Sequence, residues 1–404
     1  MSANPAAAGL SPERLSRIGA RMTKHIDEGR MAGGIGLIMR RGHLGYFETW
    51  NMSEDAILRI YSMTKAITGV AAMMLFEEGE FALADPISRF IPEFREMRVA
   101  VESPDPATGR PADTGRMLLT GTVPAARPIT VLDLMRHTAG FNYTGPHDEK
   151  GDLIYPQHGI IGDLKRSNTP GAFSSAEFVK RLAGIPLVRE PGTAWDYGFG
   201  TDVLGRIVEI ISGQTLAEFF AQRIFRPLRM VDTGFHVSEA NWPRLVPIYS
   251  LTPAGTIQPT TGPSQDGFRN PPEMSSGGAG LTSTVFDYLR FVRMLQNGGE
   301  LDGERLLSPL TVNLMRSDML GDLPVAHPLL APGHGFGLTF AISRGPGQTG
   351  TLPSAGQYRW GGAAGTAFWI DPIQDMAAIF MIQTLPDPAR RSEFMQLAYQ
   401  AIVG

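Results

Sequence analysis

The sequence predicts an α+β fold of the α/β sandwich type, in which helices flank an antiparallel β-sheet built from both ends of the chain. Residues 33–49 contain two short apolar runs around a turn at Arg41–Gly42, which indicates a pair of strands. Residues 335–384 contain four more short runs, rich in aromatic and β-branched residues and separated by turn residues. Between these ends, apolar residues recur at three- and four-residue intervals, which indicates helices. This order favours a layered α+β arrangement.

One helix is predicted before the first strand pair in the sequence and another after it. Ser11 is a typical N-cap and Pro12 suits the first helical position, so an amphipathic helix is expected from Pro12 to about Glu28. A second helix follows the strands and contains YSMTKAITGVAAMMLF at residues 61–76. It is expected to end where Gly79 can serve as the C′ residue.

The middle of the chain alternates helices with long loops. Thr130 is expected to cap a short helix that ends at Gly140. Apolar periodicity predicts further helices at residues 174–185, 201–228, 283–299 and 387–403. Segments rich in Pro, Gly and polar residues predict long loops at residues 97–128, 141–173 and 235–275. We therefore expect two domains: residues 1–90 with 275–404, which hold the sheet, and residues 91–274, a mainly helical insertion with long loops.

The composition is that of an ordinary globular protein and excludes several classes. The 404 residues are 43% hydrophobic with a formal net charge of −4, which gives no electrostatic footprint for nucleic acid. No stretch approaches the ~18 apolar residues of a membrane span, so no membrane partner is expected. The absence of cysteine excludes disulfides, thiol nucleophiles and cysteine-ligated metals. The N-terminal segment lacks the features of a secretory signal, and we expect a cytoplasmic protein.

Ser62 and Lys65 stand one helical turn apart at the mouth of the second predicted helix. The Ser-x-x-Lys spacing places the hydroxyl and the ammonium on the same helix face. The eleven residues after Lys65 are uncharged, which is typical of a buried helix. Burial disfavours a charged amine, so a base can become available beside the hydroxyl. The alternative is a capped helix whose lysine reaches the surface.

Two further segments carry candidate chemistry. Tyr197 lies in the loop REPGTAWDYGFG, and its phenol can take the proton of Ser62 if the two meet in space; otherwise it is a packing residue. Trp360–Gly362 precedes a strand-like run, and paired glycines at a strand edge let a ligand approach the backbone; the alternative is a simple turn. The N–H groups of Ser62 and Ala363 are the candidate donors to an oxyanion.

These segments together resemble the serine β-lactamase and penicillin-binding protein superfamily. Within it, the chain is most similar to the class C-like branch called family VIII carboxylesterases, which also includes acyltransferases. The resemblance rests on Ser62-Met63-Thr64-Lys65, Tyr197-Gly198-Phe199 and Trp360-Gly361-Gly362, in this order and spacing. The flanks LMRHTAG, EPGTAWDY, SSGGAGLTST and GFGLTF are also similar, and the resemblance runs from about residue 10 to the end.

The resemblance implies a serine β-lactamase-like fold and a role for each matched residue. Ser62 takes the place of the nucleophile, and Lys65 with Tyr197 that of the acid/base pair. The backbones of Ser62 and Ala363 take the place of the oxyanion hole. The residues that correspond to the substrate-binding positions are Trp360, Gly361, Gly362 and Phe199. Catalysis of this kind needs no metal and no cofactor, so none is expected.

The sequence departs from the β-lactamase pattern at two of these positions. Trp360 stands where those enzymes have lysine or a similar cation, and no lysine occurs after Lys180. Phe199 stands where they have asparagine. Both changes favour neutral esters over anionic β-lactams. We therefore expect a serine esterase that hydrolyses small, short-chain carboxylic esters through an acyl-enzyme on Ser62.

Three other functions remain open from the sequence: transfer of the acyl group to an alcohol, a weak β-lactamase or D-Ala peptidase-type activity, and a non-catalytic binding relative. No serine lies in Gly-x-Ser-x-Gly, so the nucleophile elbow of α/β-hydrolases is not supported. Residues 137–158 gather histidine and acidic side chains but fit no metal motif. Five aromatic residues are candidates for either the pocket or the core: Trp195, Phe199, Phe336, Tyr358 and Trp360. The expected partner is a small-molecule ester, and the sequence makes no prediction about oligomeric state.

Overall fold

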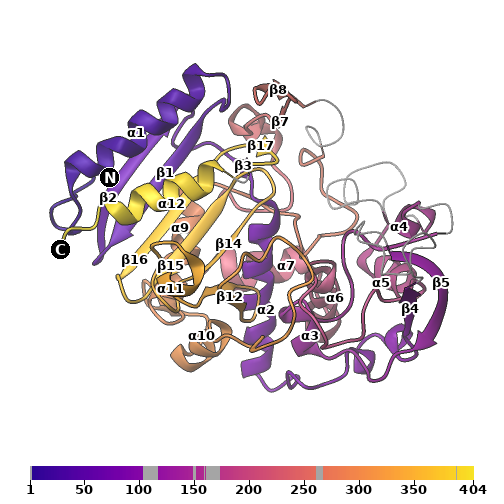
Figure 1. Ribbon diagram of the computed structural model, residues 1–404. Coiled ribbons are helices and arrows are strands. Elements are labelled where there is room, and N and C mark those ends of the chain that lie inside the picture. Colours follow the sequence, from indigo (N-terminus) through magenta and orange to yellow (C-terminus); the bar gives the residue numbers. More distant parts are fainter. Residues whose placement is uncertain are drawn as a thin grey trace.

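The centre of the molecule is a seven-stranded antiparallel sheet in the order β12-β13-β14-β15-β16-β1-β2 (Figure 1). The computed structural model describes residues 2–102, 117–148, 152–158, 160, 173–260, 267–387 and 389–404. The strands of the sheet are β1 (Gly34–Arg40), β2 (His43–Trp50), β12 (His334–Phe336), β13 (Ala341–Ser343), β14 (Tyr358–Gly361), β15 (Ala367–Asp371) and β16 (Met376–Met381). Pairing of β1 with β16 joins the two ends of the chain, which confirms the predicted α+β class and the origin of the sheet.

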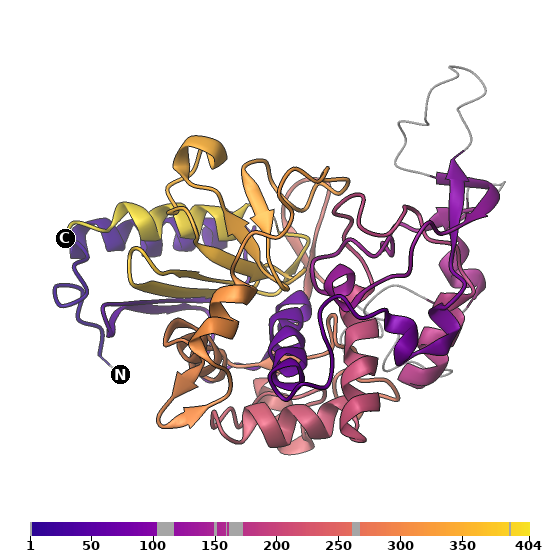
Figure 2. The ribbon, with the colours of Figure 1, turned by 90° about the horizontal axis from the view of Figure 1, so that it is seen from below.

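Helices cover both faces of the sheet, because both faces carry apolar side chains. α1 (Pro12–Asp27) and α12 (Arg390–Gln400) pack side by side on one face. α9 (Val285–Gln296) packs against β15 and β16 on the other. Figure 2 shows these two layers on opposite sides of the strands. Ser11 caps α1 by accepting a hydrogen bond from the Arg14 amide, as the sequence predicts.

The helix that contains Lys65, α2 (Thr64–Glu77), lies at the centre of the molecule. Residues 64–75 are all buried, so the uncharged run after Lys65 reflects contact on every side of the helix. It packs on α6 (Gly200–Ser212), and Figure 1 places it between the sheet and the helical part of the chain. Gly69 allows a close approach, because a Cβ there would lie 2.4 Å from Oγ1 of Thr339.

The remaining elements are short and lie around this frame. The helices are α3 (Val131–Met135), α4 (Ile154–Gln157), α5 (Ser175–Ala183), α7 (Leu216–Phe220), α10 (Pro309–Met315) and α11 (Pro346–Thr349). The strand pairs are β3 (Leu58–Arg59) with β9 (Thr282–Ser283), and β10 (Glu300–Leu301) with β11 (Glu304–Arg305). Thr130 caps α3 in a capping box with Asp133, but the helix ends at Met135, five residues before the predicted Gly140.

The predicted loops contain strands that the sequence did not indicate. Residues 97–128 include β4 (Arg98–Glu102) and β5 (Met117–Pro124), which pair antiparallel. β6 (Pro146–His147) pairs with β5. Residues 235–275 include β7 (Tyr249–Leu251) and β8 (Ile257–Pro259), and β7 also pairs with β17 (Thr384–Leu385). These loop predictions were wrong because the strands lack a clear local apolar alternation and depend on their pairing partners, which for β7 include the distant β17.

Two sequence predictions are not decided by this architecture. The domain boundaries, residues 1–90 with 275–404 and residues 91–274, stay a prediction.

Within the described part of the chain, no helix is both long and apolar enough to cross a membrane. The cytoplasmic location also stays a prediction.

Candidate active site

Ser62 lies in a single 3₁₀ turn, Tyr61–Met63, immediately before α2. Tyr61 has a φ of 43°, which is uncommon for a bulky residue and turns the chain sharply before the serine. Ser62 is 9% exposed and Lys65 is fully buried. Lys65 Nζ donates a hydrogen bond of 3.3 Å to Ser62 Oγ, so the two groups meet on one face, as the Ser-x-x-Lys spacing predicts.

The buried ammonium of Lys65 is satisfied by groups from distant segments. It donates to the carbonyl oxygen of Gly278 at 2.8 Å and to the phenol oxygen of Tyr143 at 3.2 Å. It also lies 4.6 Å from the centre of the Tyr197 ring, within the range of a cation–π interaction. Lys65 therefore does not reach the surface, and the alternative of a lysine that snorkels to solvent is excluded.

Tyr197 completes the polar cluster from the loop before α6. Its hydroxyl donates a hydrogen bond of 2.7 Å to Ser62 Oγ. The adjacent Gly198 has no room for a side chain, because a Cβ there would lie 2.1 Å from the carbonyl oxygen of Phe141. The amide of Tyr143 donates to the carbonyl oxygen of Tyr197 at 3.3 Å. Close backbone contact thus fixes the phenol over the serine.

His137 supports the ring of Tyr197 from behind. The two ring centres are 4.8 Å apart, and the His137 carbonyl oxygen accepts from the Asp196 amide at 2.8 Å. Burial, followed by the positive charges of Lys65 and His327, holds the pKa of His137 well below its usual range. The imidazole is therefore neutral at physiological pH and adds no second positive charge beside Lys65.

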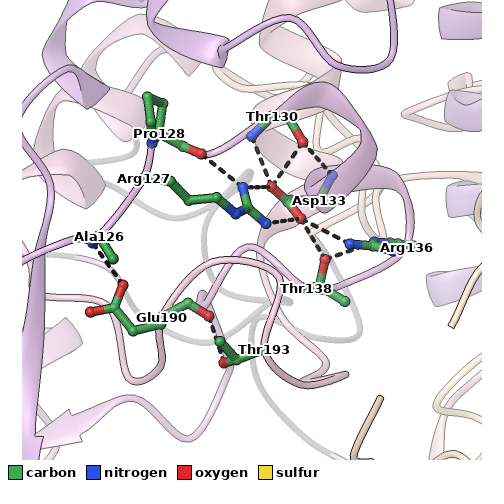
Figure 3. A network of polar contacts seen from close by, with 9 residues as sticks. All are labelled: Ala126, Arg127, Pro128, Thr130, Asp133, Arg136, Thr138, Glu190 and Thr193. Atoms are coloured by element: carbon green, nitrogen blue, oxygen red, sulfur yellow. Dashed lines mark hydrogen bonds and ion pairs between the residues drawn. The ribbon is translucent and has the colours of Figure 1, made fainter. Parts of the chain in front are cut away.

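A buried carboxylate anchors the segment that carries His137 (Figure 3). Asp133 accepts two hydrogen bonds from Arg127, at 2.6 and 2.9 Å, and one of 2.7 Å from the Thr138 hydroxyl. Burial raises the pKa of Asp133, but hydrogen bonds from Arg127 and Thr130 more than offset it and leave the pKa below its usual range. The Thr138 carbonyl accepts from the Gly192 amide at 2.7 Å, so this network is joined to the loop that leads to Tyr197.

The third predicted segment lies against the serine turn. Gly362 passes so close to Ile60 that a Cβ on the glycine would lie 2.4 Å from the Ile60 carbonyl oxygen. Ala363 follows and is exposed. Among the described residues, neither the Ser62 amide nor the Ala363 amide donates to a protein acceptor. Both N–H groups therefore remain candidate donors to an oxyanion.

The candidate aromatic residues separate into three groups. Trp360 packs on Tyr197 and Phe336, with ring centres 5.4 and 5.3 Å apart, and Trp195 lies 6.5 Å from it. Phe199 is buried, and its ring centre lies 4.7 Å from that of Tyr143. It therefore supports the phenol ring of Tyr143, the second tyrosine near Lys65. Tyr358 packs on Phe340 in the core, away from this cluster.

Sequence reasoning missed two groups that contact Lys65. Tyr143 follows the similar flank LMRHTAG, and Gly278 lies within SSGGAGLTST, so both segments were noticed without their roles. The acidic and histidine-rich stretch is only partly described, since Glu149 lies outside the described residues. Among the residues that are described, no group of three His, Asp or Glu side chains is arranged to hold a metal ion.

Comparisons with known proteins identify the family of this chain. The sequence profile of the Beta-lactamase family matches residues 18–401. Protein Rv1367c of Mycobacterium tuberculosis is 34% identical over an alignment of 380 residues that covers 89% of this chain and 88% of that protein. Esterase EstB of Burkholderia gladioli is 28% identical over an alignment of 413 positions that covers 95% of this chain and 94% of that protein. The structure of EstCE1, a hydrolase with promiscuous acyltransferase activity, has a TM-score of 0.74 at 24% identity and covers 97% of this chain and 99% of its own. The chain therefore belongs to the Beta-lactamase family of serine hydrolases.

Proposed function

We propose that this protein is a serine carboxylesterase that hydrolyses small, short-chain esters through an acyl-enzyme on Ser62. The observation that carries the proposal is the contact of Ser62 Oγ with both Tyr197, at 2.7 Å, and Lys65, at 3.3 Å. A hydroxyl becomes a useful nucleophile when a neighbouring group removes its proton during attack. Both candidate groups are within hydrogen-bond reach.

The proposed reaction has two steps that use the same groups. The reactive form has Tyr197 as a phenolate beside the Lys65 ammonium; Ser62 attacks the ester carbonyl while the phenolate takes its proton and becomes a neutral phenol. The N–H groups of Ser62 and Ala363 bind the oxyanion. The alcohol leaves with the proton from Tyr197. Water, activated by the same pair, then attacks the acyl-enzyme and releases the carboxylic acid.

The proposed substrate site lies beside Trp360, Gly361 and Gly362. The indole replaces a cation on β14, and the two glycines keep the strand edge open to a ligand. Phe199 contributes indirectly, by packing behind Tyr143. A cephalosporin should be turned over weakly or not at all, and saturable, efficient hydrolysis of one would favour a β-lactamase instead.

Mass spectrometry after reaction with a fluorophosphonate tests the nucleophile without assuming a substrate. The adduct is expected on Ser62 and should be absent in Ser62→Ala, which should also lose hydrolysis of 4-nitrophenyl acetate while it keeps the wild-type Tm. Ser53→Ala, a change of an exposed serine, is the matched control. Ester hydrolysis at the wild-type rate in Ser62→Ala would reject the assignment, and failure to label Ser62 would favour a non-catalytic relative.

Transfer to an alcohol is the second candidate, because EstCE1 combines hydrolysis with acyl transfer. The same acyl-enzyme would then be attacked by an alcohol in place of water. Analysis of the products formed from 4-nitrophenyl acetate with added benzyl alcohol separates the two functions. Benzyl acetate as the main product would favour a transferase, whereas acetate as the main product favours an esterase.

A further inference from the structure

Aromatic side chains surround the ring of Tyr197 and leave it open on one side. Three of them are buried, with ring centres 4.8 to 5.9 Å from that of Tyr197: His137, Trp195 and Trp360. Two others, Tyr143 and His327, lie at 5.3 and 5.9 Å and are only half-buried. The side of Tyr197 that faces solvent is therefore the side on which Tyr143 and His327 lie.

Backbone hydrogen bonds hold the segment that carries His327 against the tyrosine loop. The Trp195 amide donates to the carbonyl oxygen of Pro324 at 2.8 Å, and the Ala326 amide donates to the carbonyl oxygen of Trp195 at 2.9 Å. Trp195 lies two residues before Tyr197. The position of His327 beside Tyr197 is thus set by main-chain contacts, which suits a residue that must meet a substrate in a fixed place.

The same segment also reaches the proposed substrate strand. Leu329 lines a cavity of about 170 Å³ that is lined as well by Trp360 and Gly361. Leu329 and Val325, which stand two positions on either side of His327, are 41% and 45% exposed. His327 therefore lies between the tyrosine loop and the strand edge, with exposed apolar side chains next to it.

One nitrogen of the His327 imidazole is engaged and the other is not. The Leu329 amide donates to Nδ1 at 3.2 Å. Burial lowers the pKa of His327, although the Asp196 carboxylate opposes this, so the neutral form predominates at physiological pH. When Nδ1 accepts, Nε2 carries the proton of the neutral ring. Within the described part of the chain, Nε2 has no hydrogen-bond partner, and on a half-buried residue this N–H is within reach of a ligand.

The nearby carboxylate of Asp196 does not account for His327. Its Oδ2 atom accepts from Nε of Arg189 and from Nδ2 of Asn142, each at 3.1 Å. Among the described residues, neither oxygen of Asp196 is hydrogen-bonded to His327. The imidazole is therefore not held in place as the partner of a structural ion pair.

The proposed chemistry places the alcohol part of the ester on this open side. Tyr197 gives its proton to the leaving alcohol, so the alcohol oxygen must come within hydrogen-bond reach of the phenol. The chain attached to that oxygen then extends away from the buried rings, toward Tyr143 and His327. Water, or an acceptor alcohol, takes the same place in the second step.

Resting on the esterase function proposed above, we propose that His327 is a specificity-determining residue that donates a hydrogen bond from Nε2 to an ether or hydroxyl oxygen in the alcohol part of the ester. The substrate class is an ester of an uncharged alcohol that carries such an oxygen a few bonds from the ester group. The apolar side chains of Val325 and Leu329 suit the hydrocarbon part of this alcohol, and a single placed donor fixes its orientation.

Esters that differ by one atom test this role. 2-Methoxyethyl acetate and butyl acetate differ only where an oxygen replaces a CH₂ group, and 3-methoxypropyl acetate with pentyl acetate extends the spacing by one carbon. His327→Phe keeps a ring but no donor, and it should lower kcat/KM for at least one ether ester by about 3- to 10-fold, as expected for a lost neutral hydrogen bond. The alkyl partners should change less than twofold.

Two further variants and one further pair of esters serve as controls. His327→Gln keeps an N–H group near the position of Nε2 and should recover part of the loss. His43→Phe, at an exposed histidine where β2 begins, should match wild type. Ethyl methoxyacetate and ethyl butanoate carry the same replacement in the acyl part and should respond equally to His327→Phe. Equal losses for ether and alkyl acetates, or a loss confined to the acyl pair, would overturn the proposal.

Nuclear magnetic resonance separates failure of this role from failure of the esterase function. In Ser62→Ala protein with ¹⁵N-labelled histidine, 2-methoxyethanol should shift the Nε2 resonance of His327 more than butan-1-ol does. The resonance is identified by its loss in Ser62→Ala with His327→Phe. If wild-type protein hydrolyses no ester but this shift is seen, the esterase proposal fails and the binding role stands. Equal shifts with the two alcohols, no shift, or a proton on Nδ1 would overturn the role of His327.

Discussion

The phenol oxygen of Tyr197 and the hydroxyl oxygen of Ser62 lie 2.7 Å apart in space and 135 positions apart in sequence. The serine is presented by a 3₁₀ turn at the start of a buried helix, and the tyrosine by a loop that is packed against residues 137–143. Each segment is held by backbone hydrogen bonds and by a close glycine contact, at Gly362 for the serine turn and at Gly198 for the tyrosine loop. The contact is therefore a property of the folded frame rather than of either side chain.

Replacing Tyr197 by Phe removes this hydroxyl and keeps the ring that packs on His137 and Trp360. If the phenol is the acid/base group, kcat for 4-nitrophenyl acetate should fall by about 10²- to 10⁴-fold, while KM and Tm change little. Tyr249→Phe, at a half-buried tyrosine of β7, is the control and should match wild type. A Tyr197→Phe enzyme that keeps more than a tenth of wild-type activity would contradict the assignment.

Tyr143→Phe tests the second phenol, whose oxygen accepts from Lys65 at 3.2 Å. Lys65 keeps its contacts with Gly278 and Ser62 in this variant, so the effect should be smaller than at Tyr197. We expect kcat to fall about tenfold, because a hydrogen bond to a charged group contributes about 1.5 kcal/mol. A loss as large as that of Tyr197→Phe would instead identify Tyr143 as the main proton acceptor.

Ala363→Pro removes one of the two amides that are proposed to bind the oxyanion. Loss of one oxyanion donor typically lowers kcat by about 10²- to 10³-fold, and we expect this range for ester hydrolysis. Ala363→Gly keeps the N–H group and should remain within a few-fold of wild type. Steady-state kinetics of the two variants, with Tm as a check on folding, test whether the Ala363 amide binds the oxyanion. A fully active Ala363→Pro enzyme would show that the oxyanion donor lies elsewhere.

Asp133→Asn tests the network behind Tyr197. The variant should unfold more easily at pH 7, by about 1–3 kcal/mol, because buried donors lose part of their acceptor. The folded-state pKa of Asp133 is lowered, so its contribution to stability is present above the unfolded pKa of about 3.9 and is lost as pH falls through the lower folded value. The Tm difference between wild type and variant should therefore shrink at acid pH.

Asp322→Asn is the matched control for that measurement, because Asp322 is exposed and outside the network. It should leave Tm near wild type at both pH values. A Tm difference for Asp133→Asn that stays constant from pH 7 down to about pH 2.5 would show that the carboxylate charge does not stabilise the fold.

Much of the frame was predictable because its signals are local. The cap at Ser11, the turn at Arg41–Gly42 and the uncharged run after Lys65 each depend on neighbours within a few residues. The strands β4 and β5 were not predictable in this way, since they are held by pairing across a segment of the chain. The end of α3 was misplaced because the chain leaves the helix at Arg136, and the side chains of Arg136 and Thr138 then bond to Asp133.

The sequence by itself determined the family and the antiparallel sheet made from both chain ends. It also identified Ser62, Lys65 and Tyr197 as candidates, because short motifs and apolar periodicity depend only on residues close together in the chain. Only the tertiary structure decided what those groups touch. Tyr143 and Gly278 reach Lys65, and His327 reaches the ring of Tyr197, across long stretches of chain. Such contacts arise from how helices and strands pack around a shared core, and no spacing along the sequence encodes them.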